Sequence, residues 1–259
     1  MLSWNLSGKT ALVSGASQGI GEATALILAS RGARVIALAR NEEKLKGLVS
    51  RLSGEGHSYI VADLAKTDLV EREVLPQLKG KDVQILINNA GGPQGGPLLE
   101  ASIKEFDEPL RAHLLASHLL VQACVPQMTA FQYGRIINII STSVKNPIPN
   151  LGVSNTVRGA MASWSKTLAG ELGVHGITVN NVLPGYIKTG RLESLMQASA
   201  QKQSLNEQEI EEQWKETVPL KRIGRPEEVA EVISFLVSPA ASYVNGINVP
   251  VDGGRTPSL

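Results

Sequence analysis

At 259 residues the chain can bury a sizeable core, and its 42% apolar and 19% charged content is ordinary for a globular protein. A net charge of +1, without a block of like charges, gives no field that would attract nucleic acid or an anionic membrane. A single cysteine, Cys124, excludes an intrachain disulfide, and no apolar run suits a signal peptide or a membrane span. We therefore expect a cytoplasmic protein without nucleic-acid or membrane partners.

Short apolar runs alternate with amphipathic stretches along the whole chain. The runs are rich in β-branched residues, as in parallel strands that are covered on both faces. In chain order, the expected strands are Thr10–Ser14, Arg34–Ala39, Tyr59–Ala62, Val83–Ile87, Ile136–Ile140, Thr178–Leu183 and Ile247–Val251. The expected helices are Glu22–Arg31, Glu42–Leu52, Asp68–Leu78, Ser102–Phe131, Ser154–Leu172 and Glu227–Val237. Gly32 follows the first helix, where a left-handed C-cap is expected. This rhythm predicts an α/β fold, with residues 1–259 forming one domain around a doubly wound parallel sheet, a Rossmann fold.

The segment from Gly190 to Thr217 departs from this rhythm, because it contains no strand pattern and is rich in Gln, Glu and Ser. Ser204 and Glu207 have the spacing of a capping box. Apolar residues recur at helical spacing in two stripes, Leu192, Leu195 and Met196, then Ile210, Trp214 and Val218. The segment is either a surface helical excursion or, as we expect from its position, a helical lid over a site.

A glycine-rich loop, Ser14-Gly15-Ala16-Ser17-Gln18-Gly19-Ile20-Gly21, follows the first strand and opens the first helix. Glycines permit a tight turn and a close backbone approach, and a helix N-terminus offers free N–H groups to a pyrophosphate. The spacing differs from the G-x-G-x-x-G form, yet the strand–loop–helix context still predicts a dinucleotide site.

Further motifs agree with this loop. Asn88-Asn89-Ala90-Gly91 ends the fourth strand, Asn180-Asn181-Val182-Leu183-Pro184-Gly185 ends the sixth, and Val251-Asp252-Gly253-Gly254 lies near the C-terminus. With the glycine loop and Asp63, these motifs resemble the short-chain dehydrogenase/reductase family over nearly the whole chain. The resemblance implies a cofactor site formed by Gly15, Ser17, Gln18, Gly19, Ile20, Gly21, Arg40, Asp63, Leu64, Asn89, Ala90, Gly91, Arg158, Pro184, Gly185, Ile187 and Thr189.

The end of the second strand favours NADP over NAD. An NAD site usually has an acid here for the ribose 2′-hydroxyl, whereas this chain has Ala39 and Arg40. A planar guanidinium suits a 2′-phosphate, although Arg40 could also be a solvated surface residue.

The catalytic segment departs from the family. The family places a serine, a tyrosine and a lysine here, and an asparagine on the preceding long helix. The serine position is Ser141, but the other three hold Ser154, Arg158 and His113. Serine is shorter than tyrosine and a weaker acid, and arginine keeps its proton, so the ordinary mechanism cannot run unchanged.

Several other groups could handle the proton. His113 could donate it, Tyr186 could do so as a phenol near the nicotinamide end, or Ser141 and Arg158 could stabilise an alkoxide that water protonates. Lys145 follows the serine strand and could face either the substrate or the solvent. The remaining histidines have no metal-ligand spacing, and we expect no metal site.

Two functions therefore remain open. The first is an NAD(P)-dependent oxidoreductase that acts on a carbonyl or alcohol of partly apolar character with an atypical proton donor. The second is an inactive dinucleotide-binding protein that serves as a sensor or scaffold. The family resemblance also implies a homodimer or homotetramer.

Overall fold

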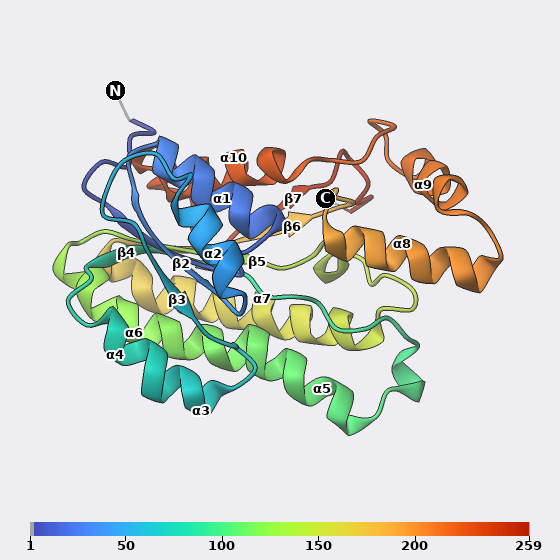
Figure 1. The fold of residues 1–259 in the computed structure, drawn as a ribbon, viewed down its shortest axis with the longest axis horizontal. Coiled ribbons are helices and arrows are strands. Elements are labelled where there is room, and N and C mark those ends of the chain that lie inside the picture. The colour runs from blue at the N-terminus through green and yellow to red at the C-terminus, as the bar shows by residue number, and fades with distance from the viewer. Residues whose placement is uncertain (1–2, 259) are drawn as a thin grey trace.

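Residues 3–258, which the computed structural model describes, form a three-layer structure around one parallel sheet (Figure 1). The strands stand in the order β3-β2-β1-β4-β5-β6-β7. Their bounds are β1 Thr10–Ser14, β2 Arg34–Ala39, β3 Ser58–Val61, β4 Val83–Asn88, β5 Gly134–Ile139, β6 Ile177–Pro184 and β7 Asn248–Val251. Every pairing is parallel, and the order reverses between β1 and β4. The predicted doubly wound sheet is confirmed, and its reversal point is where ligands bind in such sheets.

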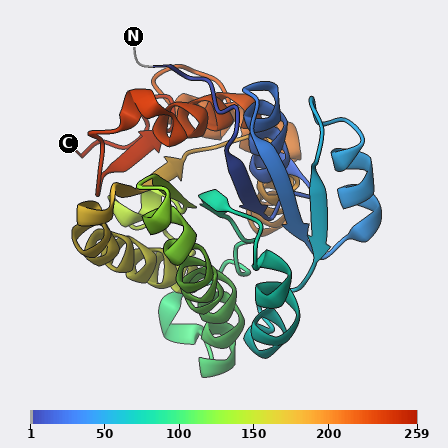
Figure 2. The same cartoon turned by 90° about the vertical axis from the view of Figure 1, so that its left-hand side faces the viewer.

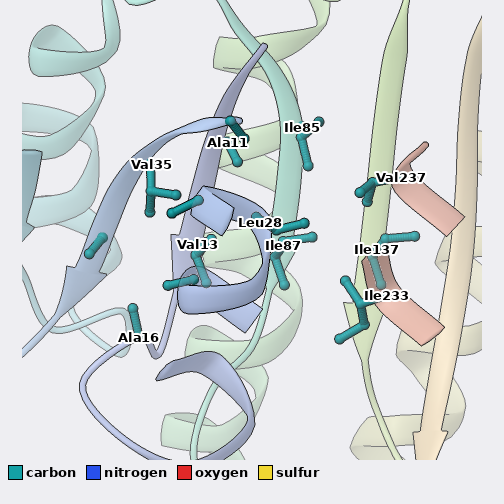
Figure 3. Close-up of a cluster of buried hydrophobic side chains, with 14 of the residues drawn as sticks. Ala11, Val13, Ala16, Leu28, Val35, Ile85, Ile87, Ile137, Ile233 and Val237 are labelled. Carbon is teal, nitrogen blue, oxygen red and sulfur yellow. The ribbon is translucent and has the colours of Figure 1, made fainter. Parts of the chain in front are cut away.

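Helices cover both faces of the sheet (Figures 1 and 2). One face carries α1 (Gly19–Ser30), α2 (Glu42–Val49) and α10 (Pro226–Val237), and the other carries α4 (Leu75–Leu78), α6 (Ala116–Ala130) and α7 (Gly152–Leu172). Alternate strand residues enter the two cores: Val13 and Ile87 pack against Leu28 and Ile233 on the first face (Figure 3), while Leu12 faces the other core. Both sheet faces are therefore buried, which explains the continuous apolar runs.

Two expected helices are interrupted by π-helical turns. The stretch expected as Ser102–Phe131 consists of α5 (Ile103–Leu110), a π turn at Arg111–Leu115, and α6. Buried Pro109 lies just before this turn and lacks the N–H that a regular helix would use. Similarly, α3 (Thr67–Leu69) leads through a π turn at Val70–Val74 into α4, which contains Pro76. The first of these turns carries His113, so it affects the site directly.

A row of asparagine side chains, buried except for the half-buried Asn248, crosses the sheet. Asn88 donates to Asn138 (2.8 Å), Asn138 to Asn181 (3.0 Å), and Asn181 to Asn248 (2.8 Å). The Asn138 amide also donates to Ser165 Oγ on α7 at 2.8 Å. These bonds tie α7 to β5 and fix the helix that carries the candidate catalytic residues.

Two helices, α8 (Gly190–Gln203) and α9 (Glu207–Glu216), form the expected excursion and lie together at one end of the molecule (Figure 1). Met196, Ala200 and Ile210 form a small buried core between them. The predicted capping box was wrong by two residues: Asn206 and Glu209 cap α9, while Ser204 ends α8 with φ +54°. Gly32 has the expected left-handed backbone, at φ +92°. Within residues 3–258, no helix combines the length and apolar character that crossing a membrane requires.

Candidate active site

A cleft of about 1120 Å³ opens where β1, β4, β5 and β6 end. The glycine loop, the Asn89–Gly91 turn, Ser141 and the Pro184–Thr189 turn all line it, together with α8. Every residue expected to bind the cofactor lines this cleft except Gly21. Ser141, Ser154 and Arg158 line it as well, so one cavity unites the candidate cofactor and catalytic residues.

The glycine loop is packed against Asn89 so closely that two positions have no room for a side chain. Gly15 has φ +60°, and a Cβ there would lie 2.5 Å from Asn89 Nδ2. A Cβ at Gly21 would overlap the Gly15 carbonyl oxygen. The Asn89 amide donates to the carbonyls of Ser14 and Gly15, at 3.3 Å each. Gly21 thus packs against the backbone of Gly15 on the side of the loop away from the cleft, so it does not line the cleft.

One end of the cleft is basic near β2. Arg40, Asn41 and Lys44 line it, and Lys44 Nζ donates to Gln18 Oε1 at 3.0 Å. Asn41 caps α2 by accepting from Lys44 N. Sequence reasoning had identified Arg40 but not Lys44, which reaches the cleft one helical turn later.

Arg158 is a buried cation that lines the same cleft. Its side chain comes from α7, is only 8% exposed, and donates from Nη1 to the Ile139 carbonyl at 2.9 Å. Its buried Nε has no hydrogen-bond partner. Burial, reinforced by the nearby Arg191 charge, lowers the pKa of Arg158 to about 10, so it stays a cation at neutral pH. Ser154 lies one turn earlier, and Ser141 Oγ accepts from Ser143 N at 3.1 Å.

Comparison with known proteins agrees with this geometry. Residues 15–256 match the family model described as enoyl-(acyl carrier protein) reductase. The chain is 36% identical over 259 residues to dehydrogenase/reductase SDR family member 4 of Sus scrofa, covering 98% of this chain and 89% of that protein. It is 34% identical over 257 residues to a 3-oxoacyl-(acyl-carrier-protein) reductase of Vibrio cholerae, covering 96% and 98%.

The chain belongs to the short-chain dehydrogenase/reductase family. Among solved structures, it resembles L-sorbose reductase from Gluconobacter frateurii in complex with NADPH and L-sorbose. The TM-score is 0.91 at 28% identity, and the match covers 99% of both chains. The likeness thus extends over the whole fold.

His113 occupies an unexpected environment in this short-chain dehydrogenase/reductase. Its ring is 4% exposed, does not line the cleft, and uses Nε2 for a 2.9 Å hydrogen bond to the Gly91 carbonyl. Because a carbonyl only accepts, Nε2 is the donor, and the other ring nitrogen of neutral histidine carries no proton. Burial first, and then the Arg158 charge, lowers the pKa of His113 well below 6.5. Among the proton donors left open by the sequence, this geometry does not favour direct donation by His113.

The neutral state of His113 has a consequence for stability. As the pH falls below 6.5, the unfolded state takes up a proton that the folded state rejects, so the fold loses stability. We expect His113→Gln, whose amide nitrogen reaches about as far as the Nε2 that bonds Gly91 and which cannot titrate, to remove a loss of up to about 1.4 kcal/mol per pH unit. Urea unfolding of both proteins from about pH 5 to pH 7.5 measures this. Parallel stability curves would refute the expectation.

Three residues that line the cleft were not predicted from the sequence: Trp214, Arg255 and Arg191. Trp214 of α9 stacks on Tyr186 with ring centroids 4.7 Å apart, and the Arg255 guanidinium lies 4.3 Å from the Tyr186 ring centre. Arg255 Nη2 also donates to the Tyr186 hydroxyl at 3.1 Å. Arg191, at the start of α8, donates to the Pro93 carbonyl. These residues come from the excursion and the C-terminal tail, whose position no local pattern specifies. Within residues 3–258, no group of three or more metal-ligating side chains could hold an ion.

Proposed function

We propose that the protein is an NADP-dependent oxidoreductase that interconverts a carbonyl and an alcohol. The observation that carries this proposal is the single cleft that holds the glycine loop, Ser141 and Arg158 together. The names of the relatives support it, because both curated relatives are reductases or dehydrogenases and the L-sorbose reductase structure contains NADPH.

The residues of the cleft fit a dinucleotide phosphate. The glycine loop has the cramped backbone and open helix N-terminus that a pyrophosphate needs, and Thr189 and Asn89 flank it. Arg40 and Lys44 would bind the 2′-phosphate, since both cations line the cleft after β2 whereas Glu42 and Glu43 do not. The nicotinamide, when bound, supplies or accepts the hydride. The chain's own residues must orient the substrate and move the proton.

We propose that this site is atypical, because Ser154 and Arg158 stand where the family has its tyrosine and lysine. Ser154 is too short and too weakly acidic to replace the phenol. Arg158 keeps its charge and can anchor the ribose or stabilise an oxyanion. Ser141 would hydrogen-bond the substrate oxygen, and His113 would act as a positioning residue that fixes Gly91.

Tyr186 is the proton donor that the geometry favours. Ser141 follows β5 and Tyr186 follows β6, and these neighbouring strands are parallel, so both residues emerge at one sheet edge. The Tyr186 oxygen accepts a hydrogen bond from Arg255, which leaves its own O–H free to donate into the cleft.

The excursion formed by α8 and α9 acts, in this proposal, as a lid. Leu192, Leu195 and Ala198 face the cleft from α8 and would give the substrate site its partly apolar wall. Trp214 fixes α9 to Tyr186, and Arg191 fixes the start of α8 to Pro93. Assembly as a homodimer or homotetramer, and a cytoplasmic location, stay predictions.

Cofactor choice provides the first test. We expect NADPH to bind more tightly than NADH by at least about tenfold, and Arg40→Asp to reverse that preference by placing an acid beside the ribose. Calorimetric titration of each protein with each cofactor measures both affinities. Lys9→Asp, remote from this cleft, is the charge-matched control. Equal affinity of the wild-type protein for both cofactors would contradict the assignment.

Turnover distinguishes the enzyme from an inactive cofactor-binding sensor or scaffold. NADPH-loaded protein should oxidise its cofactor with at least one carbonyl compound in a panel of ketones, oxo acids and sugars. Tight binding without oxidation across the panel would favour the sensor or scaffold instead.

A further inference from the structure

The side chains that line the cleft carry an excess of positive charge. The lining contains six basic residues and two acidic ones: Arg40, Lys44, Arg158, Arg191, Lys202 and Arg255 against Asp63 and Glu108. The whole chain is almost neutral, with 25 basic and 24 acidic residues, so the excess is local to the cleft. Arg40 and Lys44 belong to the proposed 2′-phosphate end. The other four cations also line this cleft, and Glu108, one of its two acids, is exposed to solvent.

Within residues 3–258, Arg158 and Arg191 have no acidic partner. Every ion pair found within residues 3–258 involves other side chains. Arg158 contacts a carbonyl through Nη1, and its buried Nε is unsatisfied. Arg191 donates to the Pro93 carbonyl through Nη2.

Both guanidinium groups line the same cleft, and the Arg191 charge contributes to the lowered pKa of Arg158. Two neighbouring cations, one almost fully buried, are costly unless an anion completes the site.

The Arg191 side chain makes its contacts with the loop that follows β4. A Cβ at Gly92 would lie 3.3 Å from Arg191 Nε and Nη2, so the guanidinium lies against the loop that follows β4. Arg158, its electrostatic neighbour, lies on α7 beside Ile139, two residues before Ser141. The proposed pyrophosphate position is at the N-terminus of α1, beside Gly19.

We propose that the substrate of this enzyme carries a carboxylate, which binds between the guanidinium groups of Arg191 and Arg158 while its carbonyl faces Ser141. A guanidinium presents two parallel N–H groups that match a carboxylate. This inference rests on the proposed function and narrows its substrate class to oxo acids and hydroxy acids. Arg191 would then determine specificity, since Arg158 has a second role beside the cofactor.

Binding measurements with matched probes test this proposal independently of turnover. NADPH-saturated protein is titrated calorimetrically, in buffer of low chloride, with pyruvate, methyl pyruvate, benzoylformate and methyl benzoylformate. Each acid and its ester share a carbonyl skeleton and differ in charge. We expect at least one acid to bind at least about tenfold more tightly than its ester, the loss that typically follows removal of a charged hydrogen bond.

Variants identify the residue responsible. Arg191→Gln should abolish the preference for the acid while changing NADPH affinity by less than about twofold, and Arg191→Lys should retain part of it. Lys188→Gln is the control, because this exposed residue lies nearby, loses the same charge, and does not line the cleft. NADPH binding also shows that each variant is folded.

Three results would overturn the proposal. The first is that neither acid binds better than its ester to NADPH-saturated wild-type protein. The second is that the preference survives Arg191→Gln. The third is that Arg191→Gln weakens NADPH binding tenfold or more, which would assign Arg191 to the cofactor phosphates. Failure of the wild-type protein to bind NADPH would instead refute the proposed function, and this inference with it.

Discussion

Replacing Tyr186 by phenylalanine should lower the turnover number by about a hundredfold or more, because a positioned general acid typically contributes that much. The aromatic ring and its stacking on Trp214 remain in this variant, and only the hydroxyl that accepts from Arg255 is lost. NADPH affinity should therefore stay within about twofold, since the change affects proton transfer alone. Steady-state kinetics with the best carbonyl substrate, together with NADPH titration, measure both quantities.

The control for this variant is Tyr243→Phe, which removes the hydroxyl of a fully exposed tyrosine outside the cleft. An unchanged turnover number in Tyr186→Phe would contradict the assignment of the donor. Proton delivery by water to an alkoxide held by Ser141 and Arg158 would then be the remaining mechanism among those considered.

Replacing Arg158 by methionine should stabilise the empty protein and inactivate it. The guanidinium is buried, bonds one carbonyl, and leaves its Nε unsatisfied, so methionine relieves a desolvation cost. We expect the free energy of unfolding to rise by roughly 1 to 3 kcal/mol, by analogy with the replacement of buried charges by apolar side chains. Turnover should fall about a hundredfold, the usual effect of removing an oxyanion donor.

Urea unfolding without cofactor and kinetics at saturating NADPH check the two halves of this prediction. Arg135→Met is the matched control, because Arg135 is another buried arginine and lies outside the cleft, where its guanidinium stacks on Tyr133 4.1 Å from the ring centre. That variant should lose stability, since a cation–π contact and two carbonyl hydrogen bonds disappear. A lower free energy of unfolding in Arg158→Met would contradict this prediction. It would show that the Arg158 guanidinium stabilises the empty protein.

We therefore expect the guanidinium groups of the cleft to lower the stability of the empty protein. His113 stays neutral first because its ring is buried and then because the Arg158 charge is close. Arg191 adds a second unpaired guanidinium at the substrate end. Such an arrangement is unfavourable in the empty protein and becomes favourable only when an anion enters, which is how binding energy can be coupled to substrate choice.

The sequence predicted the sheet well because its strands are buried on both faces. Continuous β-branched runs such as Ile136–Ile140 have no alternative that would hide both surfaces, so their positions agree with the structure within one or two residues. The glycine loop was predicted equally well, because Gly15 needs a left-handed backbone and has no room for a side chain.

The substrate end of the site was not predictable from local patterns. Arg191 and Arg255 reach it from the lid and from the C-terminal tail, and only the tertiary fold brings them to Tyr186 and Arg158. The lone His113 gave no indication of burial, because the π turn that carries and buries it was not predicted from the sequence. The capping box was misplaced because Ser204 and Asn206 offer competing caps, and the left-handed backbone at Ser204 decides between them.

The most direct test of the account is a single-turnover experiment. Protein loaded with one equivalent of NADPH is mixed with pyruvate, benzoylformate and their methyl esters, and the loss of nicotinamide absorbance is followed in a stopped-flow instrument. We expect at least one acid to oxidise the bound cofactor completely, its ester to react at least about tenfold more slowly, and Tyr186→Phe to suppress the reaction. Bound NADPH that none of these carbonyl compounds oxidises would contradict the account.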